Sequence, residues 1–441
     1  MNQQEIARKV YEAGIVGAGG AGFPTHVKMA AKAEIYLVNG AECEPLLKVD
    51  QQLAVMHAAE LVRGLELGMQ ATGAKEGILA FKAKYAEAIA AVKPLLRPNM
   101  RIHILQDVYP AGDEVITIWM ATGRRVPPAQ IPLSIGVVVN NVQTLINVTR
   151  AVDHGRPVTH RTITVTGAVK KPVTVTLPLG TSMRDAIALA DGLSIPEADA
   201  SFIDGGPMMG GLLETLDGPI TKTTGGIIAL PSSHLLIRRR RADARSIISM
   251  ARTVCEQCVL CTELCPRHLI GHELPPHLIV RSVNFNDVGH PSVLLSALTC
   301  SECAICEAYA CPVEISPMRL NQMLKARFRA EGARYTGELR KLDPMIEGRL
   351  LPIDRLIPRL GLTTYNRKAP FEETGYLPES VSLRLRQHIG VAAVPTVAVG
   401  ERVACGQCIA TIPDKAMGAP VHASIDGVVG ALTDDAIILR R

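Results

Sequence analysis

Eight of the eleven cysteines in this 441-residue chain fall into two runs of fixed spacing. The runs are Cys255-x2-Cys258-x2-Cys261-x3-Cys265-Pro266 and Cys300-x2-Cys303-x2-Cys306-x4-Cys311-Pro312. Three thiolates two residues apart can bind one cuboidal cluster, and a fourth thiolate followed by proline completes the ligand set. The spacing predicts two [4Fe–4S] clusters, and therefore a protein that transfers single electrons.

The fourth cysteine of each run is expected to bind the other run's cluster, as it does in two-cluster ferredoxins. This crossed pattern assigns Cys255, Cys258, Cys261 and Cys311 to one cluster and Cys265, Cys300, Cys303 and Cys306 to the other. It would hold the two clusters close together. Zinc is the alternative, but zinc sites rarely use a triple two-residue spacing followed by Cys-Pro. One extra residue, Tyr309 or Ala310, precedes the last cysteine, and we expect it to loosen cluster binding or shift the potential.

The composition is typical of a multi-domain protein, because 441 residues exceed one ordinary domain and 47% of them are hydrophobic. The N-terminal residues lack the pattern of a secretory signal, and thiols in metal-ligand spacing indicate a reducing, cytoplasmic compartment. No stretch approaches the roughly 18 uncharged apolar residues that span a bilayer. We therefore expect a protein that is not embedded in a membrane.

The charge balance does not favour nucleic acid as a partner. The net charge is only +5, and aromatic residues make up 3% of the chain, too few for a base-stacking surface. One dense basic run, four arginines at 238–241, leads into the first cysteine run. It is interpreted as a solvated helix start or as a docking patch for an acidic partner.

The organisation along the chain predicts a multi-domain α/β and α+β fold. Residues 1–155 alternate helical patterns with short apolar strands, which is typical of an α/β layer. Residues 156–234 change to alternating strands, a short helix and a glycine-rich segment, which predicts a small β-grasp (SLBB-like) domain. Residues 235–345 hold the cysteine runs between helical segments and form the expected helical two-[4Fe–4S] ferredoxin domain. A proline-rich connector over 346–380 precedes a compact β module over 381–441.

A glycine-rich segment, residues 14–28, has the sequence GIVGAGGAGFPTHVK. Glycines let backbone amides approach a phosphate without side chains in the way, and a following helix start adds its dipole. The segment contains a formal G-x-G-x-x-G, but the Rossmann fingerprint requires a preceding strand, and EIARKVYEAG predicts a helix. The sequence alone leaves two interpretations, a phosphate loop outside an ordinary dinucleotide fold and a flexible glycine loop.

Three further segments accompany this loop: NGAECEP at 39–45, YPAGDE at 109–114 and NNVQT at 140–144. In this order, the four segments resemble the flavin-bearing, NADH-oxidising subunit of respiratory complex I and, more closely, the C subunit of the Rnf electron-transport complex. The resemblance implies a complex-I-like FMN-binding α/β domain. Complex I has arginine and aspartate where this chain has Ala18 and Ala41, so two flavin contacts of that family are expected to be missing.

The same resemblance implies roles for eleven residues. It assigns the FMN phosphate to Gly17, Gly19, Gly20 and Lys28, the flavin to Asn39, Asn140, Asn141 and Thr144, and the nicotinamide side of NADH to Glu42, Glu44 and Glu114.

The order of the modules narrows the resemblance. QHIGVAAVPTVAVGERVACGQCIA and APVHASIDGVVGAL resemble a biotinyl/lipoyl-like barrel-sandwich module, which comes first in Rnf C subunits but last in this chain. This order, and the entire chain, resembles the cobalamin reductases of propanediol-utilisation microcompartments, the PduS family. The resemblance implies a place in a bacterial microcompartment, with shell proteins and the cobalamin adenosyltransferase as partners.

The implied reaction joins a two-electron donor to one-electron acceptors. NADH gives up a hydride, a cluster takes one electron, and FMN can accept a pair and release electrons singly, so no catalytic side chain is expected. The resemblance supplies a corrinoid acceptor, reduced from cob(III)/cob(II)alamin to cob(I)alamin for adenosylcobalamin regeneration. The sequence has no Asp-x-His-x-x-Gly motif for base-off cobalamin, so we expect a partner to present the corrinoid. The alternatives are an electron-input subunit of an Rnf-type membrane complex and a non-enzymatic electron-carrying or shell-linking protein.

Three other features have ordinary explanations. Lys415 resembles the lysine that carries lipoate in acyl-carrier domains, but we interpret it as a solvated turn residue. Cys405 and Cys408 have thioredoxin-like spacing, but they lie in a predicted strand-turn-strand rather than at a helix start. Cys43 lies between two glutamates that disfavour its thiolate, so we expect a packing cysteine.

Overall fold

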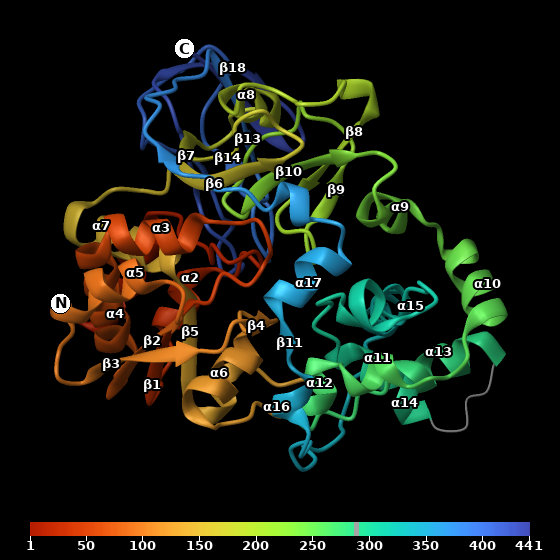
Figure 1. Ribbon diagram of the computed structural model, residues 1–441. Helices are drawn as coiled ribbons and strands as arrows, with labels where there is room; N and C mark the ends of the chain where they lie inside the picture. The colour runs from red at the N-terminus through yellow and green to blue at the C-terminus, as the bar shows by residue number, and fades with distance from the viewer. Residues whose placement is uncertain (286–290) are drawn as a thin grey trace.

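The computed structural model describes residues 1–285 and 291–441 and shows four packed parts joined by a connector (Figure 1). The N-terminal part lies at the lower left of that view, the cysteine-rich helical part at the lower right, and the two β parts lie together above them. No helix among the described residues is long and apolar enough to cross a membrane.

The N-terminal part is built on a parallel sheet with the strand order β3-β2-β1-β5. Its strands are β1 (Ile35–Gly40), β2 (Glu76–Lys82), β3 (Met100–Leu105) and β5 (Val137–Asn141). The central strands are almost continuously apolar, because helices cover both faces of the sheet. The order runs outward from β1 to β3 and then returns to the other side of β1 with β5. The strand order therefore reverses between β1 and β5, which makes this the switch point where open α/β sheets bind ligands.

The helices of this part pack on two faces. On one face lie α1 (Gln3–Glu12), α3 (Val49–Met56), α4 (Ala58–Thr72), α5 (Ala86–Val92) and α7 (Val142–His154), and on the other lies α6 (Glu114–Thr122). Short elements complete it: α2 (Thr25–Met29), η1 (Lys93–Leu95), β4 (Val108–Tyr109) and η2 (Pro132–Ile135). The chain breaks at His57, so the alanine-rich sequence around it forms the end of α3 and the start of α4 rather than one helix.

The second part is a six-stranded mixed sheet with the order β12-β7-β6-β10-β8-β9. Its elements are β6 (His160–Gly167), β7 (Val173–Pro178), α8 (Met183–Leu189), η3 (Glu197–Asp199), β8 (Ala200–Asp204), β9 (Gly211–Leu213) and β10 (Gly226–Pro231). The edge strand β12 (Phe371–Glu372) comes from the connector and pairs in parallel with β7. The connector is therefore partly integrated into this sheet.

The cysteine-rich part is helical, as predicted. It contains α9 (Leu235–Arg241), α10 (Ala244–Val254), α11 (Leu260–Glu263), α12 (Pro266–Leu269), α13 (Pro276–Phe285), α14 (Pro291–Leu295), η4 (Ser296–Thr299), a π-helical turn η5 (Cys306–Ala310) and α15 (Pro317–Ala330). The four-arginine run forms the last turn of α9, where Arg238 and Arg241 are exposed but Arg239 is only 8% exposed. The run therefore ends a helix rather than starting one, and its interpretation as solvated or as a docking patch is wrong for Arg239, because α9 packs against both the β-grasp sheet and the cysteine-rich helices.

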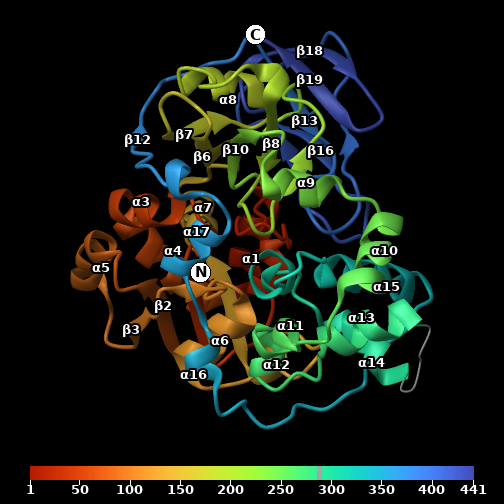
Figure 2. The same cartoon turned by 45° about the vertical axis from the view of Figure 1, so that its right-hand side comes forward.

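The connector runs between the N-terminal and cysteine-rich parts, as both views show (Figures 1 and 2). It contains α16 (Ile346–Arg349), β11 (Leu351–Pro352), α17 (Ile353–Arg359) and η6 (Thr363–Tyr365). Strand β11 pairs with β4, and its apolar side chains join a core shared by Tyr109 and Cys303. The connector thus fixes the cysteine-rich part against the N-terminal sheet.

The C-terminal part is a sandwich of two antiparallel sheets with the orders β13-β19-β18-β15 and β14-β16-β17. Its strands are β13 (Ser380–Arg384), β14 (Val394–Pro395), β15 (Arg402–Val403), β16 (Cys408–Thr411), β17 (Val421–His422), β18 (Gly427–Leu432) and β19 (Ala436–Arg440). It packs on the β-grasp part, where Ser382 donates its amide to the carbonyl of Gly180 at 2.9 Å. It also reaches back to the glycine-rich segment, because Ile389 donates its amide to the carbonyl of Gly22.

Candidate functional site

The glycine-rich segment forms a closed loop beside the switch point of the N-terminal sheet. A bridge between Val16 and Pro24 closes the loop, and the Gly17 amide donates to the carbonyl of Phe23 at 2.8 Å. The amides of Gly19 and Gly20 donate to none of the described residues, and Gly20 has φ +111° with open space where a side chain would be. Free amides in a glycine turn are typical of an anion site, so the loop fits a phosphate.

Lys28 lies on α2, directly after the loop. Its Nζ donates to the carbonyl of Val139 at 2.8 Å and lies 3.9 Å from a carboxylate oxygen of Glu114. Burial lowers the pKa of Lys28, and the Glu114 carboxylate partly opposes that shift. The structure therefore places a partly buried cation between the glycine loop and the carboxyl end of β5.

The predicted asparagines lie at the carboxyl ends of β1 and β5, where Asn39 is the register partner of Asn141. Asn39 donates to the carbonyl of Gly112 at 2.8 Å, and Asn141 caps α7 by accepting from the amide of Gln143. Asn140 instead donates to the buried hydroxyl of Tyr36. Asn39 and Asn141 thus lie at the edge of the candidate site, whereas the Asn140 amide is engaged in the core.

Thr144 lies on α7 and binds the backbone of the loop through its side chain. Its hydroxyl accepts from the amide of Ala18 at 2.9 Å, and the threonine is fully buried. The predicted residues Gly17, Gly19, Gly20, Lys28 and Thr144 therefore come together around one loop, although Thr144 lies more than a hundred residues after the others in sequence.

The three predicted acidic residues do not converge. Glu42 accepts from the amide of Asp50 at 2.9 Å and so caps α3, while Glu44 accepts from the amides of Met208 and Met209 in the β-grasp part. Burial raises the pKa of Glu44. Only Glu114, which is exposed at the start of α6, lies beside Lys28.

The eight cysteines of the two runs form two groups in space. One cavity is lined by Cys265, Cys300, Cys303 and Cys306, which we call the inner thiol group. A second cavity is lined by Cys255, Cys258, Cys261 and Cys311, which we call the outer thiol group. Each group takes three thiols from one run and the fourth from the other run, which is the arrangement that crossed ligation requires.

The two cysteine runs adopt the same backbone conformation around their second cysteine. The residue before each second cysteine and the residue after it are left-handed, at Gln257 (φ 54°) and Val259 (φ 69°) in one run and at Glu302 (φ 61°) and Ala304 (φ 61°) in the other. Non-glycine residues rarely adopt this conformation, so its repetition indicates a constrained turn. These turns direct three thiols of each run toward one cavity.

The extra residue in the second run is accommodated by a π-helical turn over Cys306–Ala310. An inserted residue in a helix is commonly absorbed in this way. Cys311 is thereby still directed to the outer cavity, and its carbonyl accepts from Arg359.

Burial makes most of these thiols hard to ionise. It raises the pKa of Cys261 and Cys265 to about 12, and that of Cys306 well above the ordinary value. Such thiols become ligands when iron supplies the compensating positive charge. Among the described residues, no three His, Cys, Asp or Glu side chains converge tightly enough to hold a single metal ion.

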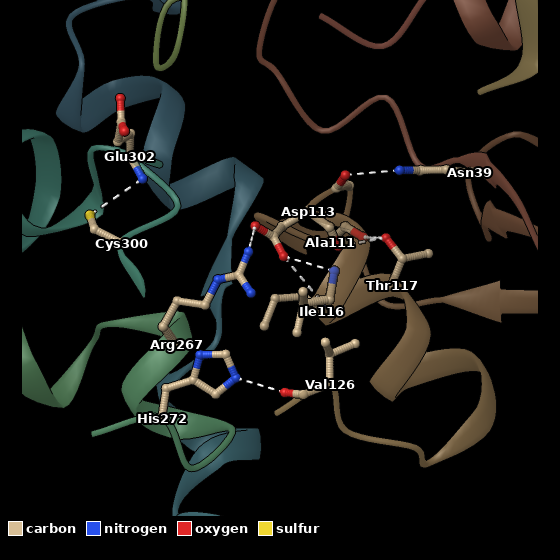
Figure 3. A network of polar contacts seen from close by, with 12 residues as sticks. Asn39, Ala111, Asp113, Ile116, Thr117, Val126, Arg267, His272, Cys300 and Glu302 are labelled. Carbon is tan, nitrogen blue, oxygen red and sulfur yellow. Dashed lines mark hydrogen bonds and ion pairs between the residues drawn. The ribbon is translucent and has the colours of Figure 1, made fainter. Parts of the chain in front are cut away.

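The inner thiol group is attached to the N-terminal part by buried polar contacts (Figure 3). Arg267, two residues after Cys265, pairs with Asp113 at 2.7 Å, and both side chains are 12% exposed. Asp113 caps α6 and follows Gly112, whose carbonyl binds Asn39. The edge of the candidate flavin site is therefore connected to the inner thiol group through a few bonded residues.

Two further contacts strengthen this interface. The Tyr109 hydroxyl donates to the carbonyl of Cys303 at 2.9 Å in a buried environment. The His272 Nε2 lies 2.9 Å from the carbonyl of Val126, which Figure 3 also shows.

Four family models match the chain. They are the Nuo51 FMN-binding domain over residues 10–150, the SLBB domain over 162–211, the 4Fe-4S dicluster domain over 254–316 and the RnfC barrel sandwich hybrid domain over 364–439. These matches confirm the predicted fold class.

Curated relatives cover the whole chain. The cobalamin reductase PduS of Salmonella typhimurium strain LT2 is 60% identical over 441 residues, which are 100% of this chain and 97% of the relative. The chain belongs to the PduS family of cobalamin reductases. The PduS of Citrobacter freundii is 58% identical over 438 residues, covering 99% of this chain and 97% of the relative. The chain is thus a flavin and iron–sulfur oxidoreductase that transfers electrons.

More distant relatives share part of the chain. The C subunit of the proton-translocating ferredoxin:NAD(+) oxidoreductase complex of Clostridium ljungdahlii is 34% identical over 275 residues, 61% of this chain and 57% of that protein. A solved structure of an NAD+-reducing [NiFe]-hydrogenase in the H2-reduced state is 22% identical with a TM-score of 0.48, covering 79% of this chain and 63% of that chain.

Sequence reasoning missed the residues that connect the parts of this PduS-family chain. Asp113 lies inside the YPAGDE segment, and Arg267 directly follows a Cys-Pro pair, so their neighbourhoods were conspicuous. Nothing in the sequence pairs them, because they lie 154 positions apart. Only the packed structure shows that they meet.

The other cysteines have structural surroundings. Cys43 packs against Gly112, and burial raises the pKa of its thiol to about 12. Cys405 and Cys408 lie in the predicted strand-turn-strand, and burial raises the pKa of both thiols. Lys415 is exposed in a surface turn.

Proposed function

We propose that this chain is an NADH-dependent reductase that delivers electrons through bound FMN and two [4Fe–4S] clusters to a corrinoid. The carrying observation is the inner thiol group, which is fixed to the domain with the glycine loop by Asp113–Arg267 and Tyr109. When bound, FMN accepts the hydride of NADH as an electron pair and passes electrons on singly, and each cluster carries one electron. One NADH would therefore reduce two Co(II) corrinoids to Co(I), releasing NAD+ and a proton.

The protein's own residues would bind FMN and position its ring. The free amides of Gly19 and Gly20, with Lys28, are proposed to hold the FMN phosphate, and Asn39 and Asn141 are proposed to line the flavin. The inner thiol group would face the flavin domain, and the outer group, with Cys258 exposed, would face the acceptor. Glu114 remains the carboxylate best placed for the nicotinamide side.

The acceptor and setting follow from the family. The relatives are named cobalamin reductases, and the Pdu name supports a role in regenerating adenosylcobalamin inside a propanediol-utilisation microcompartment. Because the sequence lacks an Asp-x-His-x-x-Gly motif, we propose that the adenosyltransferase presents the corrinoid. Shell proteins would be the other partners.

A second candidate is an electron-input subunit of an Rnf-type complex, favoured by the 34% identity to the C subunit of such a complex. Anaerobically purified protein, reconstituted with FMN, iron and sulfide, separates the candidates. NADH oxidation coupled to cob(II)alamin reduction, at one NADH for two corrinoids, supports the first. NADH oxidation without corrinoid reduction favours the second. Absence of bound FMN, or zinc in place of iron in the two thiol groups, contradicts both.

A further inference from the structure

Two buried cations from outside the FMN-binding domain touch the glycine loop. Arg161, on β6 of the β-grasp part, is 5% exposed, and Lys222, just before β10, is 3% exposed. Within the described part of the chain neither forms an ion pair, and their donors bind backbone carbonyls instead. Buried cations without a direct counter-ion are costly, so their position requires an explanation.

Arg161 binds inside the loop, and Lys222 binds Gly14, just before the bridge that closes it. Arg161 donates through Nη2 to the carbonyl of Ala18 at 2.7 Å and through Nε to the carbonyl of Thr224 at 2.6 Å. Lys222 donates to the carbonyls of Gly14 at 2.7 Å and Pro420 at 2.8 Å. Both backbone polar groups of Ala18 are thus bound, because Thr144 accepts from its amide and Arg161 donates to its carbonyl.

The end of the loop is held by two other segments. A side chain at Gly22, which has φ +64°, would meet the Thr223 methyl group at 2.8 Å and the His388 backbone at 3.1 Å. Ile389 donates its amide to the Gly22 carbonyl. The loop is therefore fixed by three domains while the amides of Gly19 and Gly20 stay free.

The electrostatics fit an anion at those free amides. Burial lowers the pKa of Arg161 to about 10, opposed by the more distant Asp50 and Asp204. Burial also lowers the pKa of Lys222 to about 7. With Lys28, three basic side chains lie near the glycine-rich segment, and a dianionic phosphate monoester would favour their protonated forms.

Building on the proposed FMN site, we propose that Arg161 and Lys222 complete the phosphate loop from outside the FMN-binding domain. Arg161 acts as a positioning residue that fixes the Ala18 peptide, and the two cations favour the phosphate electrostatically. The preference for FMN over riboflavin, which has the same ring system without the phosphate, therefore depends on the β-grasp domain.

The test is titration of the flavin-free full chain with FMN and with riboflavin, followed by flavin fluorescence. Arg161→Met should weaken FMN binding at least about tenfold, the scale of lost charge-assisted hydrogen bonds, and leave riboflavin binding unchanged. Lys222→Met should lower the ratio of FMN affinity to riboflavin affinity by a smaller factor than Arg161→Met does. Arg161→Lys, which keeps the charge but loses the forked contact, should lie between the wild type and Arg161→Met.

Arg367→Met is the matched control, because Arg367 also donates to backbone carbonyls of the β-grasp part, those of Gly167 and Val169, but not to the loop. It should leave both flavin affinities unchanged. The inference is overturned if Arg161→Met retains the wild-type preference, or if it weakens both flavins equally. If Arg161→Met fails to fold, Arg161→Lys and Lys222→Met test the inference by the same measurement, the ratio of FMN affinity to riboflavin affinity. Wild-type protein that binds no FMN would instead contradict the proposed function.

Discussion

Each thiol group takes three thiols from one run, and these triplets have the same two-residue spacing and the same left-handed turns, but the two groups have different surroundings. In the inner group Cys265, Cys303 and Cys306 are all buried, and Tyr109 and Arg267 fix the group to the FMN-binding domain. In the outer group Cys258 is exposed, and the cavity rim includes Glu256 and Gln257. Local sequence sets the turns that gather the thiols, whereas tertiary packing sets which group faces the flavin domain and which faces solvent.

The largest expected contrast comes from removing one ligand in each group. Cys303→Ala and Cys261→Ala should each remove one cluster and about half of the iron. With Cys303→Ala, NADH should no longer reduce the remaining cluster, because the inner group is lost. With Cys261→Ala, NADH should still reduce the inner cluster while delivery to a corrinoid falls. Iron analysis and electron paramagnetic resonance of NADH-reduced samples measure this, and unchanged iron would contradict the ligand assignment.

The interface at the inner group can be weakened without touching a thiol. Arg267→Met leaves the Asp113 carboxylate buried without its cation, so we expect a loss of about 3 kcal/mol in the free energy of unfolding. Urea unfolding measures this loss, and reduction of the inner cluster by NADH should slow. Arg327→Met, which removes an exposed pair with Glu331, should cost less than about 0.5 kcal/mol. Equal losses of unfolding free energy for the two variants would show that the buried Asp113–Arg267 pair stabilises the protein no more than an exposed pair does.

The same interface should be sensitive to acid. Burial, with a smaller contribution from the Arg267 charge, lowers the pKa of His272 to about 4 from its ordinary value of 6.5. Between these values the unfolded chain binds a proton that the folded chain does not, so stability is lost as pH falls from 6.5 toward 4. The loss should be about 2 kcal/mol at pH 5. Urea unfolding at pH 7 and pH 5 measures it, and His272→Gln should reduce the difference.

The smallest expected effect concerns the flavin side. Lys28→Ala removes a partly buried cation beside the glycine loop, so FMN should bind about tenfold more weakly. Both thiol groups should keep their iron, because Lys28 contacts neither of them. Flavin fluorescence and iron analysis of the same sample are the measurements. Undiminished FMN affinity would mean that the loop holds the phosphate without this lysine.

Features set by local sequence could be predicted, and features set by long-range packing could not. The spacing within each cysteine run is local and predicted three thiols around one cavity, whereas the crossed grouping was expected from the pattern of two-cluster ferredoxins. The segment EIARKVYEAG predicted the helix before the glycines correctly. The break at His57 has no local signal, because alanine-rich sequence continues through it. Arg239 was interpreted as solvated because no local pattern shows that α9 is covered by two neighbouring parts. Arg161 and Lys222 gave no signal because their partners are backbone carbonyls in distant segments.

Two C-terminal segments, around Ile389 and Pro420, contact the glycine-rich segment near the N-terminus. Gly14 and Gly22 reach their final surroundings only when Pro420 and Ile389 have been made and folded. The glycine loop can therefore reach its final surroundings only after residues 389–420 have left the ribosome. Under the proposed function, FMN would meet its complete loop only after the C-terminal β part has folded, so loss of the segment around residues 389–420 would weaken FMN binding in the N-terminal part.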